Sequence, residues 1–320
     1  MDMKHVIRHS AMAIATSAAI AAMGASSTAS QPLDHLEIFS AEAAGSSAPV
    51  QTIDFSVAVR DVAVNSRGEI IVTDPAADRV LIFASNASGA AKPAASIGGV
   101  SSTILSPSAI AFDSRGELLV ANEGRQGEGA SVAVFAPKAR GDIAPARRIA
   151  GPATSLSDPV AVAVDSRDEM YVIDAAARDV LVFAPGASGN QAPARRLAIA
   201  GYTARELAIG ADDQVYVFAS DGPRGMEEIA SFPHGSDTQA HAPLTGSGVN
   251  GANWISVDRA GLLHVLSPGR IYTFAPEASG DARPASVLNV DFFLSNCCAR
   301  MTAGADGRLY VYLTAFHWSA

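Results

Sequence analysis

The sequence predicts an all-β protein, a propeller of six blades with four strands each, and three observations lead to that prediction. A tight turn followed by a valine-containing strand recurs at spacings of 48, 52, 45, 48 and 46 residues. A strand that ends on phenylalanine follows the turn in each complete unit. The two ends of the chain each carry half of one further unit. Internal repeats of this length are typical of propellers and solenoids.

The first hairpin of each unit surrounds a turn whose anchor residue is glycine or aspartate. A valine stands four residues after every anchor, and apolar residues stand two residues after it and six residues before it. This alternation on both sides of a turn predicts a β-hairpin with one buried face. Glycine and aspartate suit a turn position that requires a positive φ. The anchors are Gly68, Gly116, Asp168, Asp213, Gly261 and Gly307.

The second hairpin of each unit begins with the strand that ends on phenylalanine. In most units a glycine follows six residues later and a proline ten residues later, whereas the unit of Phe232 departs from this spacing and has Pro243. Two hairpins per unit predict four strands, which we label A to D from the first hairpin. The phenylalanines are Phe39, Phe83, Phe135, Phe183, Phe232 and Phe274.

The two chain ends predict how the ring closes. Residues 34–54 hold a C–D hairpin with no A–B hairpin before it, and residues 301–313 hold an A–B hairpin with no C–D hairpin after it. A blade shared between the termini closes many propellers, and closure removes exposed strand edges. We therefore expect the N-terminal C–D hairpin to pair with the C-terminal A–B hairpin. The alternative is an open array of twisted sheets.

The first residues of the chain predict export. Lys4 and Arg8 precede a short apolar run over residues 11–23, and small residues follow, with a cleavage site expected after Ala29. This pattern is typical of a signal peptide, and the run is short for a membrane span. An uncleaved N-terminal anchor is the alternative.

We accordingly divide the chain into a signal peptide over residues 1–29 and a single β-propeller domain over residues 30–320. We expect a periplasmic or secreted location, without membrane insertion after cleavage. The formal net charge of −9 argues against a nucleic-acid partner, because phosphate neutralisation requires a basic surface. The only cysteines, Cys297 and Cys298, are adjacent. They form either a strained vicinal disulfide or two buried thiols.

Two stretches resemble NHL repeats. Residues 161–183 contain Asp174, Arg178 and Phe183, and residues 61–83 repeat this Asp, Arg and Phe order. The resemblance weakens in the unit of Asn122 and is lost in the later units, where Ala219, Ser267 and Leu313 take the aspartate position. It covers about residues 34–313. It implies a six-bladed propeller, but such propellers include protein-binding scaffolds, lactonases, lyases and extracellular sensors, so it does not define a function.

The loops that join strand B to strand C share one face with the loops between blades, and we predict that this face binds the ligand. Two of these loops, over residues 122–130 and 220–228, are long, charged and contain glycine. The residues predicted for this face are Asp74, Arg79, Asn122, Glu123, Arg125, Asp174, Arg178 and Arg224.

Asp74, Asn122 and Asp174 occupy equivalent positions at the end of strand B. Their oxygens would suit a divalent cation at the channel mouth, but Asp and Asn commonly cap turns, and we favour that structural role. Arg79 and Arg178 are expected to pair locally with the preceding aspartate. The alternative for these arginines is an anion-binding cluster together with Arg125 and Arg224.

No catalytic residue is identified from the sequence, and no cofactor is predicted, although a divalent cation remains the alternative at the Asp74, Asn122 and Asp174 positions. The motifs of a G-x-S-x-G nucleophile, an H-E-x-x-H zinc site and an EF-hand are all missing. We expect His234 and His241 to be exposed and His264 to pack in a B strand. The arginines of the D strands are expected to be solvated; they are Arg147, Arg148, Arg195 and Arg196.

The sequence favours an exported, non-catalytic binding or scaffold protein with a protein or a small molecule as ligand at the loop face. One alternative is a metal-dependent hydrolase or lyase, of the kind that includes lactonases, which uses the channel mouth. Another is an extracytoplasmic sensor of a small ligand. Active sites of propellers are assembled from single residues on separate blades, so the absence of a motif does not decide between these functions.

Overall fold

The structure, a computed structural model of the 320-residue chain, describes residues 34–125, 129–175, 179–221, 225–290 and 299–314. Within these ranges no helix is both long enough and apolar enough to cross a membrane. The predicted signal peptide, the two cysteines, Arg178 and Arg224 all lie outside the described residues. The predictions that concern them stay predictions.

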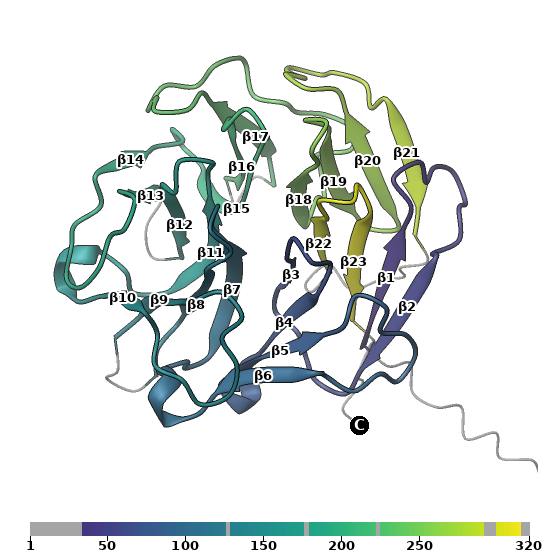
Figure 1. The fold of residues 1–320 in the computed structure, drawn as a ribbon. Helices are drawn as coiled ribbons and strands as arrows, with labels where there is room; N and C mark the ends of the chain where they lie inside the picture. The colour runs from purple at the N-terminus through teal and green to yellow at the C-terminus, as the bar shows by residue number, and fades with distance from the viewer. Residues whose placement is uncertain (1–33, 126–128, 176–178, 222–224, 291–298, 315–320) are drawn as a thin grey trace, which may run out of the picture. The chain divides into compact units, whose positions relative to one another are not determined.

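Six antiparallel sheets stand in a ring, each with its first strand innermost (Figure 1). Blade 1 consists of β3 (Val62–Val64), β4 (Ile70–Asp74), β5 (Arg79–Phe83) and β6 (Ala95–Gly98). Blade 2 consists of β7 (Pro107–Phe112), β8 (Leu118–Asn122), β9 (Ser131–Phe135) and β10 (Arg147–Ala150). Blade 3 consists of β11 (Pro159–Val164), β12 (Met170–Asp174), β13 (Val180–Phe183) and β14 (Arg195–Leu197).

The second half of the ring follows the same order. Blade 4 consists of β15 (Thr203–Ile209), β16 (Val215–Ser220) and β17 (Glu227–Phe232). Blade 5 consists of β18 (Trp254–Val257), β19 (Leu263–Ser267), β20 (Arg270–Phe274) and β21 (Ser286–Asn289). Blade 6 consists of β22 (Arg300–Ala303), β23 (Leu309–Leu313), β1 (Asp34–Phe39) and β2 (Gln51–Phe55). Three short 3-10 helices are η1 (Pro75–Ala77), η2 (Val100–Ser102) and η3 (Pro152–Thr154).

The structure confirms the six-bladed propeller and the way in which its ring closes. Strand β1 pairs with β23 in a register that runs from His35 opposite Leu313 to Phe39 opposite Leu309, and the sheet order is β2-β1-β23-β22. Blade 4 differs in detail, because an isolated bridge between Ile229 and Leu244 takes the place of its fourth strand. This is the blade in which the spacing of glycine and proline after Phe232 was lost.

All six anchor residues adopt the positive φ that the sequence predicts, including Asp168 at 65° and Asp213 at 62°. The aspartate or asparagine three residues before the anchor shapes the same turn in four blades. In blade 2, Asp113 Oδ1 accepts hydrogen bonds from the amides of Arg115 (3.0 Å) and Glu117 (2.8 Å). In blade 3, Asp165 Oδ1 accepts from the amides of Arg167 (3.0 Å) and Glu169 (2.9 Å).

The glycine six residues after the phenylalanine joins neighbouring blades. These glycines form parallel bridges to the last strand of the preceding blade at five junctions: Gly45 with Leu288, Gly89 with Ile53, Gly141 with Ile97, Gly189 with Ile149, and Gly280 with Leu244. No such bridge joins blade 3 to blade 4 in the part of the chain that the structure describes. The phenylalanines themselves are buried, each at most 2% exposed, and the core fills the spaces between blades.

Candidate active site at the channel mouth

Asp74 and Arg79 form a local ion pair, with Arg79 Nε 2.8 Å from Asp74 Oδ2. Asp74 is the last residue of β4 and is 2% exposed, so its buried carboxylate has Arg79 as its charged partner. Arg125 lies over the same loop, where its guanidinium donates to the carbonyl of Pro75 at 2.9 Å and lies 3.2 Å from Asp78. Each of these two arginines is therefore already paired with a carboxylate.

Asn122 and Asp174 cap the loops that enter their own blades. Asn122 Oδ1 accepts a hydrogen bond from the amide of Leu105 at 3.0 Å. Asp174 Oδ2 accepts from the amides of Ser157 (2.6 Å) and Asp158 (2.8 Å), and its Oδ1 accepts from the Ser157 hydroxyl at 2.9 Å. These contacts agree with the structural role that we favour from the sequence, in which Asn122 and Asp174 cap turns.

Glu123 contacts residues that come just before the innermost strands of blades 1 and 2. It forms an ion pair with Arg60, and its Oε2 accepts from the hydroxyl of Ser106 at 3.1 Å. Arg60 immediately precedes Asp61, the residue before the innermost strand of blade 1. Glu123 thus connects the predicted loop face to a set of side chains that the sequence reasoning did not single out.

The missed side chains occupy one repeated position, seven residues before each anchor. We name this set the mouth ring, and its members are Asp61, Ala109, Ala161, Glu206, Trp254 and Arg300. The position lies just before the innermost strand in blade 1, at its first residue in blades 5 and 6, and at its third or fourth residue in blades 2 to 4. Antiparallel pairing puts the starts of these strands on the same face as the ends of the B strands. We call this end of the channel the mouth.

The channel inside the ring encloses a cavity of about 270 Å³. Its walls are the innermost strands of all six blades, and Asp61, Glu206 and Trp254 of the mouth ring line it. Most of the other lining side chains are apolar, among them Val162, Leu207 and Ile255. A small cavity into which a few polar groups converge is a common form of small-molecule site.

Asp61 is a buried carboxyl group at the mouth, 7% exposed. Its Oδ2 accepts a hydrogen bond from the amide of Ile110 in the next blade at 2.7 Å, and its Oδ1 accepts from the amide of Val62 at 2.8 Å. Burial nevertheless raises its pKa to about 7, against the effect of these two hydrogen bonds and of the Arg300 charge. Asp61 therefore titrates near neutral pH.

Glu206 faces Asp61 from blade 4, the opposite blade of the ring. It is 5% exposed, and Oε1 accepts a hydrogen bond from the amide of Leu207 at 2.9 Å. The other oxygen, Oε2, is buried and has no hydrogen-bond partner among the described residues. Burial and the negative charge of Asp61 raise the pKa of Glu206 well above its usual value. Its raised pKa favours the protonated form of this carboxyl group over that of an ordinary glutamate.

Arg300 and Trp254 complete the polar part of the mouth ring. The Arg300 guanidinium lies over the Trp254 ring, 4.5 Å from its centroid, and donates to the carbonyls of Arg60 (2.6 Å) and Ala299 (3.0 Å). These contacts hold the positive charge beside the two carboxyl groups, where it lowers the pKa of both. A fixed cation of this kind favours the ionised form of whichever carboxyl group releases its proton first.

The outer rim of the mouth adds more negative charge. Asp158 lies beside the Asp174 cap, and its pKa is raised by burial and by the charges of Glu123 and Asp174. The carboxyl groups of the mouth outnumber Arg60 and Arg300. This excess of acidic groups favours a neutral or cationic ligand. The alternative of an anion-binding cluster includes Arg178 and Arg224, which lie outside the described residues, and it stays untested.

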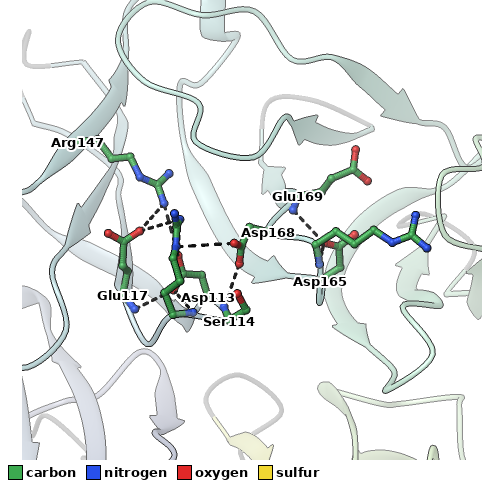
Figure 2. A network of polar contacts seen from close by, with 9 residues as sticks. Asp113, Ser114, Glu117, Arg147, Asp165, Asp168 and Glu169 are labelled. Atoms are coloured by element: carbon green, nitrogen blue, oxygen red, sulfur yellow. Dashed lines mark hydrogen bonds and ion pairs between the residues drawn. The ribbon is translucent and has the colours of Figure 1, made fainter.

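The opposite face of the propeller carries a network of ion pairs between blades (Figure 2). Asp168 Oδ1 of blade 3 accepts from the amide of Ser114 in blade 2 at 3.0 Å. Glu117 pairs with Arg147 at 2.8 Å, and Glu169 pairs with Arg195 at 2.7 Å. The prediction of solvated D-strand arginines is therefore wrong for Arg147 and Arg195, because the glutamate that follows the anchor in blades 2 and 3 binds them.

The same face contains a group of side chains that could hold a metal ion. Donor atoms of Asp165, Glu169 and His234 all lie within 4.8 Å of one another. The prediction that His234 is exposed is wrong: its side chain is 18% exposed, and Nδ1 lies 3.1 Å from Asp165 Oδ2. His264 does pack in a B strand as predicted, with Nδ1 3.0 Å from the hydroxyl of Thr273.

No protein-family model matches the chain, and no curated protein matches it. Solved structures match its fold. Hydrazine synthase of Kuenenia stuttgartiensis is 12% identical, with a TM-score of 0.59, over 80% of this chain and 74% of that one. A gluconolactonase from Xanthomonas campestris is 16% identical, with a TM-score of 0.53, over 80% and 86% of the two chains.

A third match is virginiamycin B lyase from Staphylococcus aureus, in an inactive form with quinupristin. It is 10% identical, with a TM-score of 0.53, and the match covers 80% of each chain. At these identities the likeness shows the six-bladed fold alone. The resemblance to NHL repeats stays a prediction.

Proposed function

We propose that the channel mouth binds a small polar molecule and that Asp61 and Glu206 transfer protons to and from it, as the acid–base pair of a hydrolase or lyase. The observation that carries this proposal is the pair itself: two buried carboxyl groups on opposite blades, both with raised pKa values, and one oxygen without a partner. Perturbed carboxyl groups in a cavity are typical of sites that perform acid–base chemistry.

The two carboxyl groups differ in a way that assigns their roles. Asp61 accepts two amide hydrogen bonds, which stabilise its ionised form, whereas Glu206 accepts one. Asp61 is therefore the base and Glu206 the acid. A pKa of about 7 suits Asp61 to proton transfer at neutral pH.

For an ester or a lactone, the reaction would proceed in one balanced sequence. Asp61 takes a proton from water as the water oxygen bonds to the carbonyl carbon. Glu206 gives its proton to the leaving oxygen as the carbon–oxygen bond breaks. In a lyase the same two groups would take a proton from carbon and protonate the leaving group. The cavity of about 270 Å³ limits the bound part of the substrate to a small molecule or one end of a larger one.

An exported location is part of this proposal and rests on the pattern of Lys4, Arg8 and the apolar run that follows them. In the periplasm or outside the cell, the substrate would be a molecule that the cell takes up, modifies or detoxifies. The similarity in fold to a lactonase and a lyase is compatible with this reaction class. The support for the reaction comes from the residues of the mouth.

The test is a binding and turnover screen against small lactones, esters and amines. The chain has two tryptophans, so a Trp318→Phe background leaves Trp254 in the mouth as the fluorescent reporter of binding. Glu206→Gln and Asp61→Asn should each lower turnover by roughly 100-fold or more. Glu228→Gln is the matched control, since Glu228 also has a pKa raised by burial but lies in β17, away from the channel cavity.

The outcomes separate the candidate functions. Turnover that EDTA does not affect and that both mouth variants lose would support the acid–base pair. Turnover that requires a divalent ion would support the metal-dependent alternative. A result in which compounds bind but none is turned over, and in which Glu206→Gln binds them as the wild type does, would contradict the proposal. It would favour the non-catalytic scaffold or sensor predicted from the sequence.

A further inference from the structure

A mixed group of nitrogen and oxygen donors lies on the face opposite the mouth, at the junction of blades 3 and 4. Asp165 and Glu169 belong to the turn between β11 and β12, and His234 follows β17 of the next blade. This turn has the same geometry as those of the other blades. His234 is the residue that distinguishes this junction.

Each of the three side chains has a donor atom close to those of the other two. Asp165 Oδ1 accepts from two turn amides, whereas Oδ2 accepts from the Tyr171 hydroxyl at 3.3 Å and lies 3.1 Å from His234 Nδ1. That ring nitrogen is buried and, at the angle between the two groups, forms no hydrogen bond. Glu169 Oε2 binds Arg195 at 2.7 Å and the Tyr171 hydroxyl at 3.2 Å. Among the described residues no hydrogen bond is found to its other oxygen, Oε1.

The surrounding charges favour a cation. Asp213 binds Ser166 through both carboxylate oxygens, at 2.8 and 2.6 Å, close enough to His234 for their charges to interact. Asp237 lies 3.2 Å from Arg195. The junction thus holds two guanidinium groups and four carboxylates. The guanidinium groups belong to Arg167 and Arg195, and the carboxylates belong to Asp165, Glu169, Asp213 and Asp237. Two negative charges remain, which matches a divalent ion.

An independent observation points to the same junction. Five of the six blade junctions have a main-chain bridge from a glycine to the last strand of the preceding blade, and the junction of blades 3 and 4 is the one where the described residues form none. Blade 4 has Thr238 where the other units have that glycine. A metal ion bound by side chains of both blades would join them at the junction that has no glycine bridge.

We propose that Asp165, Glu169 and His234 bind a divalent transition-metal ion, with Zn²⁺ the best fit, and that this ion clamps blade 3 to blade 4. One imidazole nitrogen and two carboxylate oxygens are among the donor sets that Zn²⁺ uses, with water in the remaining position. The site is separate from the acid–base pair at the mouth. Its role is structural and does not depend on the proposed function.

The test uses the full chain without a histidine tag, titrated with Zn²⁺ by calorimetry and with Co²⁺ by visible absorption. We expect one saturable ion per chain, the intense absorption of a four-coordinate Co²⁺ site, and a rise in the melting temperature. His234→Ala and Glu169→Gln should each abolish saturable binding and the rise in melting temperature. His234→Ala should keep the wild-type melting temperature measured in EDTA to within a few degrees, because no described group forms a hydrogen bond with His234 Nδ1.

The matched control is His264→Gln in blade 5. His264 Nε2 lies 3.3 Å from Asp258 Oδ2, but Leu262 stands where blade 3 has Glu169, so this pair lacks the third donor. His264→Gln should leave Zn²⁺ binding unchanged. The proposal is overturned if the wild-type chain binds neither ion saturably, or if His234→Ala binds as tightly as the wild type.

Discussion

Asp113 and Asp61 are both buried aspartates of the propeller, 8% and 7% exposed, yet their carboxyl groups behave in opposite ways. Burial acts on both to raise the pKa. For Asp113, on the face opposite the mouth, hydrogen bonds from Glu117 and Arg115 outweigh burial and hold the pKa below its usual range. For Asp61, at the mouth, burial outweighs two amide hydrogen bonds and the pKa rises to about 7.

The difference shows what each region does. At the opposite face the carboxylates of Asp113 and Glu117 are bound by arginines and amides, and they stabilise turns and blade junctions. At the mouth, Glu206 has a single amide donor and one oxygen without a hydrogen-bond partner among the described residues, and its pKa is raised. Asp61 lies deeper in the protein than Asp113, and Asp113 is bound by arginines as well as by amides. The depth of burial and the number of donors together decide whether a carboxyl group stabilises the fold or remains available for chemistry.

The largest expected effect is on the opposite face, from Asp113→Ala. The substitution removes the acceptor of two turn amides and the partner of Arg115, and it leaves Arg147 with one carboxylate fewer. Breaking such a buried, charged network costs about 3 to 5 kcal/mol of unfolding free energy. Urea unfolding at pH 7 measures it. A loss below about 1 kcal/mol would show that these turns do not depend on the carboxylate.

The next effect concerns how stability depends on pH. The pKa of Asp61 rises from 3.8 in the unfolded chain to about 7 in the fold, so the folded state binds more protons than the unfolded state between these values. The unfolding free energy must therefore fall as the pH rises from about 4 to 7, by an amount on the order of 4 kcal/mol from Asp61 alone.

Removing the second carboxyl group should reduce that fall. In Glu206→Gln no ionisation at position 206 opposes folding at any pH, because Gln does not titrate. The variant should be more stable than the wild type at pH 8 and about equally stable at pH 4. Denaturant unfolding at several pH values in that range provides the comparison. A variant that is less stable than the wild type at pH 8 would contradict the raised pKa of Glu206.

The smallest effect is expected from Trp254→Phe. The Arg300 guanidinium lies over the indole ring, and replacing indole by the weaker phenyl ring should cost about 0.5 to 1 kcal/mol of stability. Arg300 would keep its two carbonyl acceptors, so the charge should stay near Asp61. Thermal unfolding measures the loss. A change in the stability–pH profile of this variant would show that Trp254, and not only the carbonyls, positions Arg300.

Much of the fold was predictable because the same pattern of turns and strands recurs in each blade. The anchor residues predicted the turns, and the two half-units at the chain ends predicted the pairing of β1 with β23. The glycine after each phenylalanine was visible as a pattern, but its role as a bridge between blades was not. That role depends on which residue of the neighbouring blade it meets, as Gly189 meets Ile149.

The candidate site was not predictable by the same reasoning. Repeat analysis draws attention to positions that stay constant, whereas the mouth ring has a different character in nearly every blade. Asp61, Glu206 and Arg300 share a position with two alanines. A search for charged residues seven residues before each anchor would have found all three. The raised pKa values required burial and the opposite placement of blades 1 and 4, which only the structure provides.

The central claim is that Asp61 and Glu206 hold a proton between them at neutral pH. It is tested most directly by a carbon-13 NMR titration of the carboxyl groups, assigned with Asp61→Asn and Glu206→Gln. We predict that the Asp61 resonance titrates near pH 7 and that the Glu206 resonance titrates well above the usual glutamate range. If both carboxyl groups titrate below about pH 5, the pair is ionised at neutral pH and the acid–base account is wrong.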